Sequence, residues 1–354
     1  MRHDRARAAD LRRGGAARHR AVRGGGEGPP RAPGCGEAER DRPVSAAASP
    51  KGNVVVANAP VSYGAFELTV GILPGVPDGP MVLDEVAAAG YQGIDLGPVG
   101  YFGQGSELLQ ALSGRGLGLA GGFFELPFSD PAAMRAAVPG LSGLLDVFDS
   151  VSVLGGLKPK PTLADASSDL RRGRPAQAAI DRSLGFDSDG WKRFAEGVAM
   201  AQEVCAARGY EPTFHHETGT HIEASWEIEK VLELTTIGLC LDTGHLLLGG
   251  GDPAKKIREW GSRINHLHLK DARQSVVEGI VREVAPVDEI WKRKAFCRLG
   301  DGDLDLDSVL DYVRSSYSGW LVVEQDVLPD PDNPLGRPAV DQRANREFLQ
   351  DKGF

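Results

Sequence analysis

The chain has 354 residues, of which 41% are hydrophobic and 25% are charged, and its formal net charge is −9. This is the composition of an ordinary soluble protein, and no run approaches the roughly 18 consecutive apolar residues of a membrane helix. The acidic balance argues against a nucleic-acid partner. The four cysteines show no paired spacing, so we expect a reduced, cytoplasmic protein.

Residues 1–52 differ in composition from the rest of the chain. Residues 1–50 contain eleven Arg and six acidic residues, a net +5, which leaves −14 for the remainder. The segment is rich in Arg, Ala, Gly and Pro and lacks apolar periodicity, which predicts a disordered tail. It has no apolar stretch typical of a secretory signal, and its acids disfavour a transit peptide. We expect a dispensable tail, with a basic arm for an acidic partner as the alternative, and a folded domain over 53–354.

From Val54 onward, short apolar runs alternate with segments of helical length. Strands are predicted at 54–60, 91–98, 116–125, 150–156, 211–216, 236–241, 263–269 and 319–324. Helices are predicted at 78–90, 105–115, 130–148, 189–208, 222–234, 253–261, 274–284, 306–316 and 338–350. Residues 157–188 are polar and broken by Pro and Gly, so we expect a functional or mobile loop there and no core element.

Eight strands with helices between them, and no second compositional domain, predict an α/β fold with a single (β/α)8 TIM barrel. The alternative is an open, doubly wound sheet. We disfavour it because no Gly-rich turn follows the first strand and the chain has no Walker-type loop.

Ionisable residues gather at the ends of the later strands. Residues 213–271 hold six of the eight histidines, in the stretches TFHHETGTHIE, GLCLDTGH and INHLHLKD, and GWLVVEQD at 319–326 repeats the pattern. The carboxyl ends of barrel strands meet at one face, where active sites are built. His, Asp and Glu arriving there from separate strands indicate a divalent metal.

Alternation along each strand sorts these side chains by face. The inward set nearest the strand ends is His215, Glu217, Asp242, His268, Lys270 and Glu324. A charge at the end of an apolar barrel strand costs several kcal/mol unless it is paired or bound to metal. Helix capping alone is the alternative role for Asp242. We expect His266 to be a deeper, hydrogen-bonded core residue, and His216 and His221 to be structural or on the surface.

These motifs resemble the xylose-isomerase-like barrel superfamily of sugar isomerases, epimerases and dehydratases, and within it the inosose dehydratases. The resemblance covers roughly 53–350 and rests on APVSYG, GYQGIDLGPVGYF, FHHETGTHIE, LCLDTGHLLLGGGDP, HLHLKD, CRLGDGDLD and GWLVVEQD. It implies metal ligands at Asp242, His268 and Glu324. The fourth ligand is His215, where many relatives carry a glutamate, or Glu217. The implied ion is Mn²⁺ or Co²⁺, with Mg²⁺ or Zn²⁺ as alternatives.

The resemblance also implies roles for the remaining site residues. His245 occupies a position that contacts substrate oxygens in relatives, and Arg298, like Lys270, matches a residue that touches a polyol or its carbonyl. Asp95 and Glu125, which end the second and third predicted strands, are expected to contact substrate as well. The expected partner is a small polyol ketone or keto-sugar, with no nucleic acid and no membrane, and a homo-oligomer stays open.

The leading functional hypothesis is the loss of water from a polyhydroxy ketone such as scyllo-inosose (2-keto-myo-inositol). A bound divalent ion would acidify the C–H beside the carbonyl, and a base would then form an enediolate before a hydroxyl departs with acid assistance. Glu217 or His245 is the expected proton carrier. Lys270 is expected to stabilise the oxyanion or to assist the leaving hydroxyl.

Other functions remain open at this point. A keto-sugar 3-epimerase or isomerase would use two opposed carboxylates, and His215 at one of their usual positions favours the dehydratase unless Glu217 substitutes. A lyase that eliminates the aglycone of a 3-keto glycoside (a C-glycoside, for example) would use the same enolate chemistry. An endonuclease-IV-like nuclease would need a basic surface and more ligands. A metal-free binding barrel is disfavoured by the intact Asp242, His268 and Glu324.

Overall fold

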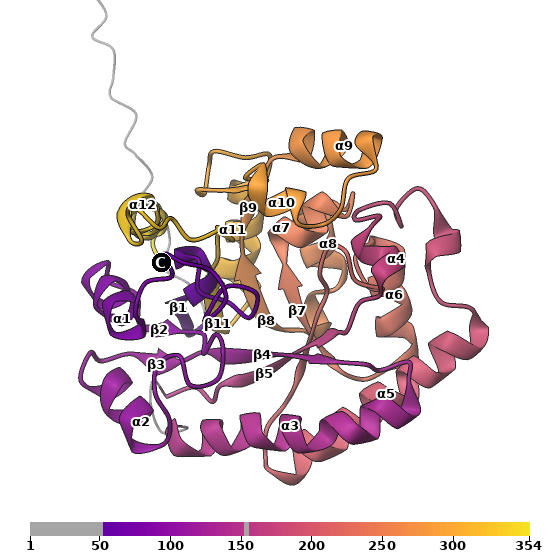
Figure 1. Cartoon of the computed structure of the whole chain (residues 1–354), viewed down its shortest axis with the longest axis horizontal. Coiled ribbons are helices and arrows are strands. Elements are labelled where there is room, and N and C mark those ends of the chain that lie inside the picture. Colours follow the sequence, from indigo (N-terminus) through magenta and orange to yellow (C-terminus); the bar gives the residue numbers. More distant parts are fainter. Residues whose placement is uncertain (1–51, 152–155) are drawn as a thin grey trace, which may run out of the picture. The chain divides into compact units, whose positions relative to one another are not determined.

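The computed structural model describes residues 52–151 and 156–354. The predicted tail lies outside this part apart from Gly52, and so do residues 152–155 of the predicted fourth strand. The described residues from 53 onward form a nine-stranded parallel sheet with helices around it (Figure 1). Among them, no helix combines the length and apolar character needed to cross a lipid bilayer.

The sheet closes into a barrel through Ala120. The strand order is β3-β2-β1-β11-β8-β7-β6-β5-β4, so β3 (Gly118–Leu119) and β4 (Gly121–Leu126) stand at its two ends. The N–H of Ala120 donates to Ile94 O at 2.9 Å, and its carbonyl accepts from Lys160 N at 3.0 Å. Because one continuous stretch pairs with both neighbours, β3 and β4 together supply one of eight barrel strands in the described chain. The predicted (β/α)8 barrel is confirmed, and the open-sheet alternative is wrong.

The remaining barrel strands are β1 Val54–Asn58, β2 Gly93–Ile94, β5 Lys160–Asp165, β6 Thr213–His215, β7 Gly238–Asp242, β8 Ile264–Leu269 and β11 Gly319–Val323. A small antiparallel pair joins β9 (Asp271–Ala272) to β10 (Phe296–Cys297). The helices are α1 Gly79–Ala88, α2 Ser106–Ser113, α3 Pro131–Val151, α4 Asp169–Arg172, α5 Ser188–Ala207, α6 Ser225–Leu234, α7 Thr243–Leu248, α8 Pro253–Glu259, α9 Gln274–Glu283, α10 Glu289–Lys292, α11 Leu306–Ser316 and α12 Gly336–Asp351. Three 3-10 turns lie at Pro60–Tyr63, Arg182–Leu184 and Gly261–Arg263.

The two faces of the strands pack differently. Outward side chains such as Leu239 and Leu267 are fully buried and join the large core between strands and helices. Inside the barrel, Trp320 belongs to a smaller apolar cluster that also contains side chains of β1 and Ala120. A Cβ on Gly93 would lie 2.5 Å from the Trp320 ring, so this glycine makes room for the indole. The barrel interior is therefore a packed floor below the strand ends and not a pore.

The described part of the predicted fourth strand at 150–156 is not a strand, and residues 152–155 lie outside the described residues. Val151 is the last residue of α3, and the fourth strand is β5, inside the 157–188 segment where we expected no core element. The run K-P-T-L-A-D begins with Lys-Pro and ends in Asp, so it offers little apolar signal. Its strand conformation comes from pairing with β4 and β6, which is a tertiary effect that local sequence does not report.

Candidate active site

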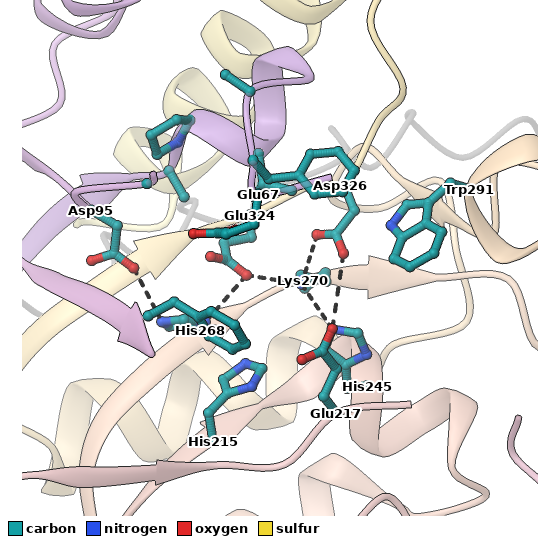
Figure 2. A pocket seen from close by; sticks show the side chains of 17 residues that line it. Glu67, Asp95, His215, Glu217, His245, His268, Lys270, Trp291, Glu324 and Asp326 are labelled. Carbon is teal, nitrogen blue, oxygen red and sulfur yellow. Dashed lines mark hydrogen bonds and ion pairs between the residues drawn. The ribbon is translucent and has the colours of Figure 1, made fainter. Parts of the chain in front are cut away.

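A pocket lies at the carboxyl ends of the strands, where barrel enzymes place their chemistry (Figure 2). Its ionisable lining comes from several strand ends and loops: Glu67, Asp95, His215, Glu217, His245, His268, Lys270, Glu324 and Asp326. Apolar side chains complete the wall, among them Pro60, Phe66, Phe123 and Trp291. The arrangement combines an apolar surface with converging polar groups, as small-molecule sites do.

Strand register brings the central residues to one level. Asp242 at the end of β7 is the direct partner of His268 on β8, and His268 also lies opposite Val322 on β11. Glu324 follows β11 at once, and its N–H donates to Leu269 O at 3.1 Å. Three neighbouring strands thus deliver a carboxylate, an imidazole and a second carboxylate side by side.

The donor atoms of these side chains are spaced as metal ligands are. His268 Nδ1 lies 3.2 Å from Glu324 Oε2 and 3.8 Å from Asp242 Oδ2, and His215 Nε2 lies 3.6 Å from Asp242 Oδ2. Two atoms bound to one ion at about 2.1 Å lie about 3.0–3.5 Å apart. Asp242 Oδ2, His215 Nδ1 and both ring nitrogens of His268 are buried without a hydrogen-bond partner. The donor set and its unsatisfied atoms therefore fit a divalent ion.

Asp242 has two separate tasks because its oxygens face different ways. Oδ1 accepts from the N–H of His245 at 2.8 Å and caps α7, while Oδ2 faces the histidines and Lys270. Its own N–H donates to His216 Nε2 at 3.2 Å. Helix capping therefore accounts for one oxygen of Asp242 and leaves the other directed at the site.

Lys270 places a buried positive charge beside the candidate ligands. Its Nζ lies 2.7 Å from Asp326 Oδ1, 2.8 Å from Glu324 Oε2 and 3.1 Å from Asp242 Oδ2. Burial alone would lower the pKa of Lys270, but Asp242, Asp326 and Glu324 outweigh it and raise the pKa well above its usual value. Lys270 is therefore a permanent hydrogen-bond donor in this pocket and not a base.

His245 is held as a neutral imidazole next to Lys270. The N–H of Thr218 donates to its Nδ1 at 3.3 Å, and its Nε2 lies 3.3 Å from Lys270 Nζ and 3.9 Å from Asp326 Oδ2. Burial and the positive charge of Lys270 lower its pKa well below the usual value. The ring thus connects the Glu217 loop to the Lys270–Asp326 pair.

Burial raises the pKa of four lining carboxylates, Glu67, Asp95, Glu217 and Asp326, and the shift is large for Glu217 and Asp326. Burial, with Glu125 and Asp326 adding to it, raises the pKa of Glu217 to about 8, and Glu217 Oε2 has no hydrogen-bond partner. Burial raises the pKa of Asp326 to about 6, against the opposing effect of Lys270. Carboxyl groups tuned in this way are suited to carry protons in catalysis.

Eight of the ten residues selected from the sequence meet around this pocket: Asp95, His215, Glu217, Asp242, His245, His268, Lys270 and Glu324. Glu125 and Arg298 do not. Glu125 is exposed and lines an adjoining cleft, because β4 turns this side chain away from the interior. Arg298 lies just beyond β10, pairs with Asp301 at 3.1 Å and lines a neighbouring hollow.

The other histidines lie outside the pocket lining. His216 accepts a hydrogen bond from the Asp242 backbone, and His221 Nδ1 lies 2.6 Å from Asp165 Oδ2, so both have structural contacts as predicted. His266 is fully buried below His268, also as predicted. The expectation that it is hydrogen-bonded is wrong, because neither ring nitrogen has a partner.

Sequence reasoning missed Asp326, Glu67, Phe123 and Trp291 as pocket residues. Asp326 follows Glu324 by two residues, just as Lys270 follows His268, and the same spacing along the chain would have found it. Glu67 comes from a loop, Phe123 from within β4 and Trp291 from the short helix α10, and no local pattern marks them.

Curated proteins with similar sequences include inosose dehydratases. The chain is 34% identical over 154 residues to the inosose dehydratase of Clostridium tetani, which covers 42% of this chain and 52% of that protein. It is 33% identical over 171 residues to inosose dehydratase 2 of Bacillus cereus, covering 47% and 56%. The matched region therefore spans about half the length of these relatives.

Solved structures with different named activities share the fold. They include the probable 3-DHS dehydratase AsbF from Bacillus anthracis (TM-score 0.57, 12% identity, 84% of this chain and 98% of that one). D-allulose 3-epimerase from Methylomonas has a TM-score of 0.58 at 13% identity, with 86% and 99% covered. The IOLI protein with a binding zinc atom has a TM-score of 0.59 at 12% identity, with 84% and 98% covered.

A match to a protein-family model gives the family of this chain, in agreement with the fold and with the similar proteins. The model described as xylose isomerase-like TIM barrel matches residues 83–351, which is most of the described domain. The resemblance inferred from the strand-end motifs is thereby confirmed, and the chain belongs to the xylose isomerase-like TIM barrel family.

Proposed function

We propose that the protein is a metal-dependent dehydratase acting on a cyclic polyhydroxy ketone such as scyllo-inosose. The observation that carries the proposal is the set Asp242, His268 and Glu324, whose donor atoms converge within 4.8 Å while buried atoms among them lack hydrogen-bond partners. The inosose dehydratases that share about a third of their matched residues with this chain support the choice of substrate.

The residues that would hold the ion are Asp242, His268 and Glu324, with His215 as the fourth ligand. A divalent ion bound there polarises a ketone and acidifies the neighbouring C–H. We propose Mn²⁺ or Co²⁺, and Zn²⁺ belongs in the same test because the IOLI structure contains zinc. Glu217 is then free for proton transfer, since its Oε2 has no other partner.

The chain's own groups divide the proton transfers between them. Glu217 in its ionised form receives the proton from the carbon beside the carbonyl at its unpartnered Oε2, and because burial raises its pKa to about 8, this ionised form is a strong base. Lys270 Nζ, already aligned by Asp326 and Glu324, donates a hydrogen bond to the negative charge that develops on substrate oxygen. The proton that Glu217 has taken from carbon then protonates the departing hydroxyl, which returns Glu217 to its starting state, while Asp326 stays ionised in its ion pair with Lys270 at 2.7 Å.

The rest of the pocket suits a polyol ring. Phe66, Phe123 and Trp291 give apolar surface for the C–H faces of such a ring, while the carboxylates and Lys270 meet its oxygens. Trp291 Nε1 is buried without a partner and is available to a substrate hydroxyl.

The experiment is an elimination assay on scyllo-inosose with protein that has been stripped of metal and then resupplied with Mn²⁺, Co²⁺ or Zn²⁺. We expect loss of water, followed as the unsaturated or dione product, only after an ion is returned. Full activity in stripped protein with chelator present would contradict the metal dependence. No turnover with any ion would contradict the substrate.

A keto-sugar 3-epimerase is the second candidate, because the same pocket is also lined by Glu67, which offers a second carboxylate besides Glu217. Epimerisation needs a base on each face of the reacting carbon, and these two side chains reach the pocket from separate loops. Product analysis with ketohexoses distinguishes the two. A ketose inverted at C3 and no unsaturated product would replace the dehydratase proposal.

A further inference from the structure

Asp95 lines the pocket beside His268, one of the candidate metal ligands. It follows β2, its N–H donates to Asn58 O at 2.9 Å, and it is 7% exposed. Figure 2 shows its carboxylate directed at the ring of His268, and Oδ2 lies 3.5 Å from His268 Nε2. Its other oxygen, Oδ1, is buried and has no hydrogen-bond partner.

The His268 ring spans two acidic groups on opposite edges. Nδ1 faces Glu324 Oε2 at 3.2 Å and Asp242 Oδ2 at 3.8 Å, while Nε2 faces Asp95. An imidazole that binds a metal through one nitrogen carries its proton on the other. A carboxylate at that second nitrogen fixes the tautomer, orients the ring and makes it a stronger ligand.

The surroundings keep Asp95 and His268 in this relation. A Cβ on Gly121 would lie 3.2 Å from Asp95 Oδ1 and 2.9 Å from Lys160 O, so only a glycine leaves space for the carboxylate there. On the other side, the His266 ring packs edge-on against His268, with centroids 5.2 Å apart and planes at 69°. His268 is thus supported from below by a ring and from the side by a carboxylate.

We propose that Asp95 is a positioning residue that accepts the Nε2–H of His268 and so presents Nδ1 to the ion. The sequence had assigned Asp95 to substrate contact, whereas this role acts through His268. The proposal rests on the metal site of the proposed function. Two other roles give different results in the same experiment: contact with substrate, and ligation of a second ion with His266, since donor atoms of Asp95, His266 and His268 lie within 4.8 Å of one another.

The test measures Co²⁺ and Zn²⁺ affinity of the full chain, without substrate, by competition with a chromophoric chelator. We expect one ion per chain in the wild type and in Asp95→Asn and Asp95→Ala. Affinity should fall about 10- to 100-fold in Asp95→Ala and less in Asp95→Asn, whose amide oxygen still accepts from Nε2–H. The Co²⁺ absorption bands should shift in both variants. In the zinc-loaded wild type, ¹⁵N NMR should show His268 protonated at Nε2.

Asp165→Asn is the matched control. Asp165 is 1% exposed and pairs with the partly buried His221 at 2.6 Å, so the variant disrupts another Asp–His pair, one that includes no candidate ligand. Its metal affinity should equal that of the wild type even if it unfolds at a lower temperature. Thermal unfolding of every variant checks that the protein measured is folded.

Three results would overturn the assignment. Wild-type metal affinity in Asp95→Ala, with only KM for scyllo-inosose raised, would make Asp95 a substrate contact. A fall from two ions to one would make it a ligand of a second ion. A wild type that binds neither ion would reject the metal site of the proposed function. If the wild type binds tightly and Asp95→Ala binds equally well, only the role of Asp95 is rejected.

Discussion

Two buried charge clusters in this barrel are built in opposite ways. The Arg171 cluster consists of Arg171, Glu223 and Glu227, all fully buried. Arg171 binds Glu227 through both terminal nitrogens, at 2.8 and 3.1 Å, and Glu223 at 3.1 Å. Backbone N–H groups donate to both carboxylates, so every carboxylate oxygen in this cluster has a partner, and only Nε of Arg171 lacks one.

The strand-end cluster consists of Asp242, His268, Lys270, Glu324 and Asp326, and it is not satisfied internally. Asp242 Oδ2 and both nitrogens of His268 lack hydrogen-bond partners. Three carboxylates outnumber the two cationic groups that face them, the Lys270 ammonium and the His268 ring, whose pKa is raised well above its usual value. This leaves an excess of negative charge that a divalent cation would balance. Buried charged groups whose hydrogen-bonding capacity is not filled are costly, so a fold keeps them where a ligand completes them.

From this difference we infer that the Arg171 cluster stabilises the fold and that the strand-end cluster binds a ligand. Arg171 comes from α4 in the irregular 157–188 segment and joins it to α6, which carries Glu227. Substitutions should therefore separate the two clusters, one affecting activity and the other the free energy of unfolding.

The largest effect is expected for Glu324→Gln. Loss of this carboxylate removes a proposed ligand and a partner of Lys270, so we expect elimination of water from scyllo-inosose to slow by at least about 10³-fold. Because Lys270 keeps Asp242 and Asp326 as partners, the unfolding temperature should fall less than in Glu227→Gln. Steady-state kinetics and thermal unfolding are the measurements, and a variant that keeps its activity would remove the metal site from the mechanism.

Glu227→Gln should lower the stability of the protein and leave its activity unchanged. Breaking a fully buried ion pair leaves Arg171 incompletely paired, and we expect the free energy of unfolding to fall by about 3–5 kcal/mol. Denaturant titration measures the loss. Activity per folded molecule and Co²⁺ affinity should match the wild type; a large loss of metal affinity in this variant would show that the two clusters are not independent.

Metal binding should stabilise the wild type and Glu227→Gln equally. At a free Co²⁺ concentration of about 100 times Kd, linkage predicts a gain of about 2.7 kcal/mol in the free energy of unfolding. Glu324→Gln should gain much less at the same concentration. Unfolding curves with and without Co²⁺ check this, and an equal gain in all three proteins would place the ion somewhere else.

The smallest effect is expected for an exposed ion pair. Asp84 is 68% exposed on the side chain and lies 2.7 Å from Arg115. Asp84→Asn should change the free energy of unfolding by less than about 0.5 kcal/mol, because water already solvates both charges. A loss comparable to that of Glu227→Gln in the same denaturant titration would contradict the expectation that breaking a buried ion pair costs more free energy of unfolding than breaking an exposed one.

The site residues that could be predicted from the sequence lie on strands in which inward and outward side chains alternate regularly. Alternation along β7 and β8 placed Asp242, His268 and Lys270 on the inner face, and register then brought them together. β5 was missed because Lys-Pro and Asp conceal a strand that its neighbours hold in place. Arg298 lies outside the pocket lining because its direction depends on how the loop after β10 turns, which no local pattern fixes.

Contacts between distant segments were outside the reach of pattern reasoning. The ion pairing of Arg171 and the position of Trp291 both depend on where long loops pack against the barrel end. The hydrogen-bond state of His266 was likewise invisible, since it depends on all neighbouring strands at once.

The central claim is that the strand-end cluster binds one divalent ion that the reaction requires. Its most direct test is a titration of metal-free protein with Co²⁺ in which Co²⁺ absorption and scyllo-inosose dehydration are followed together. Both signals should rise in parallel and level off at one ion per chain, and neither should appear in Glu324→Gln. Dehydration at full rate before any ion is added, or saturation of absorption without any dehydration, would contradict the claim.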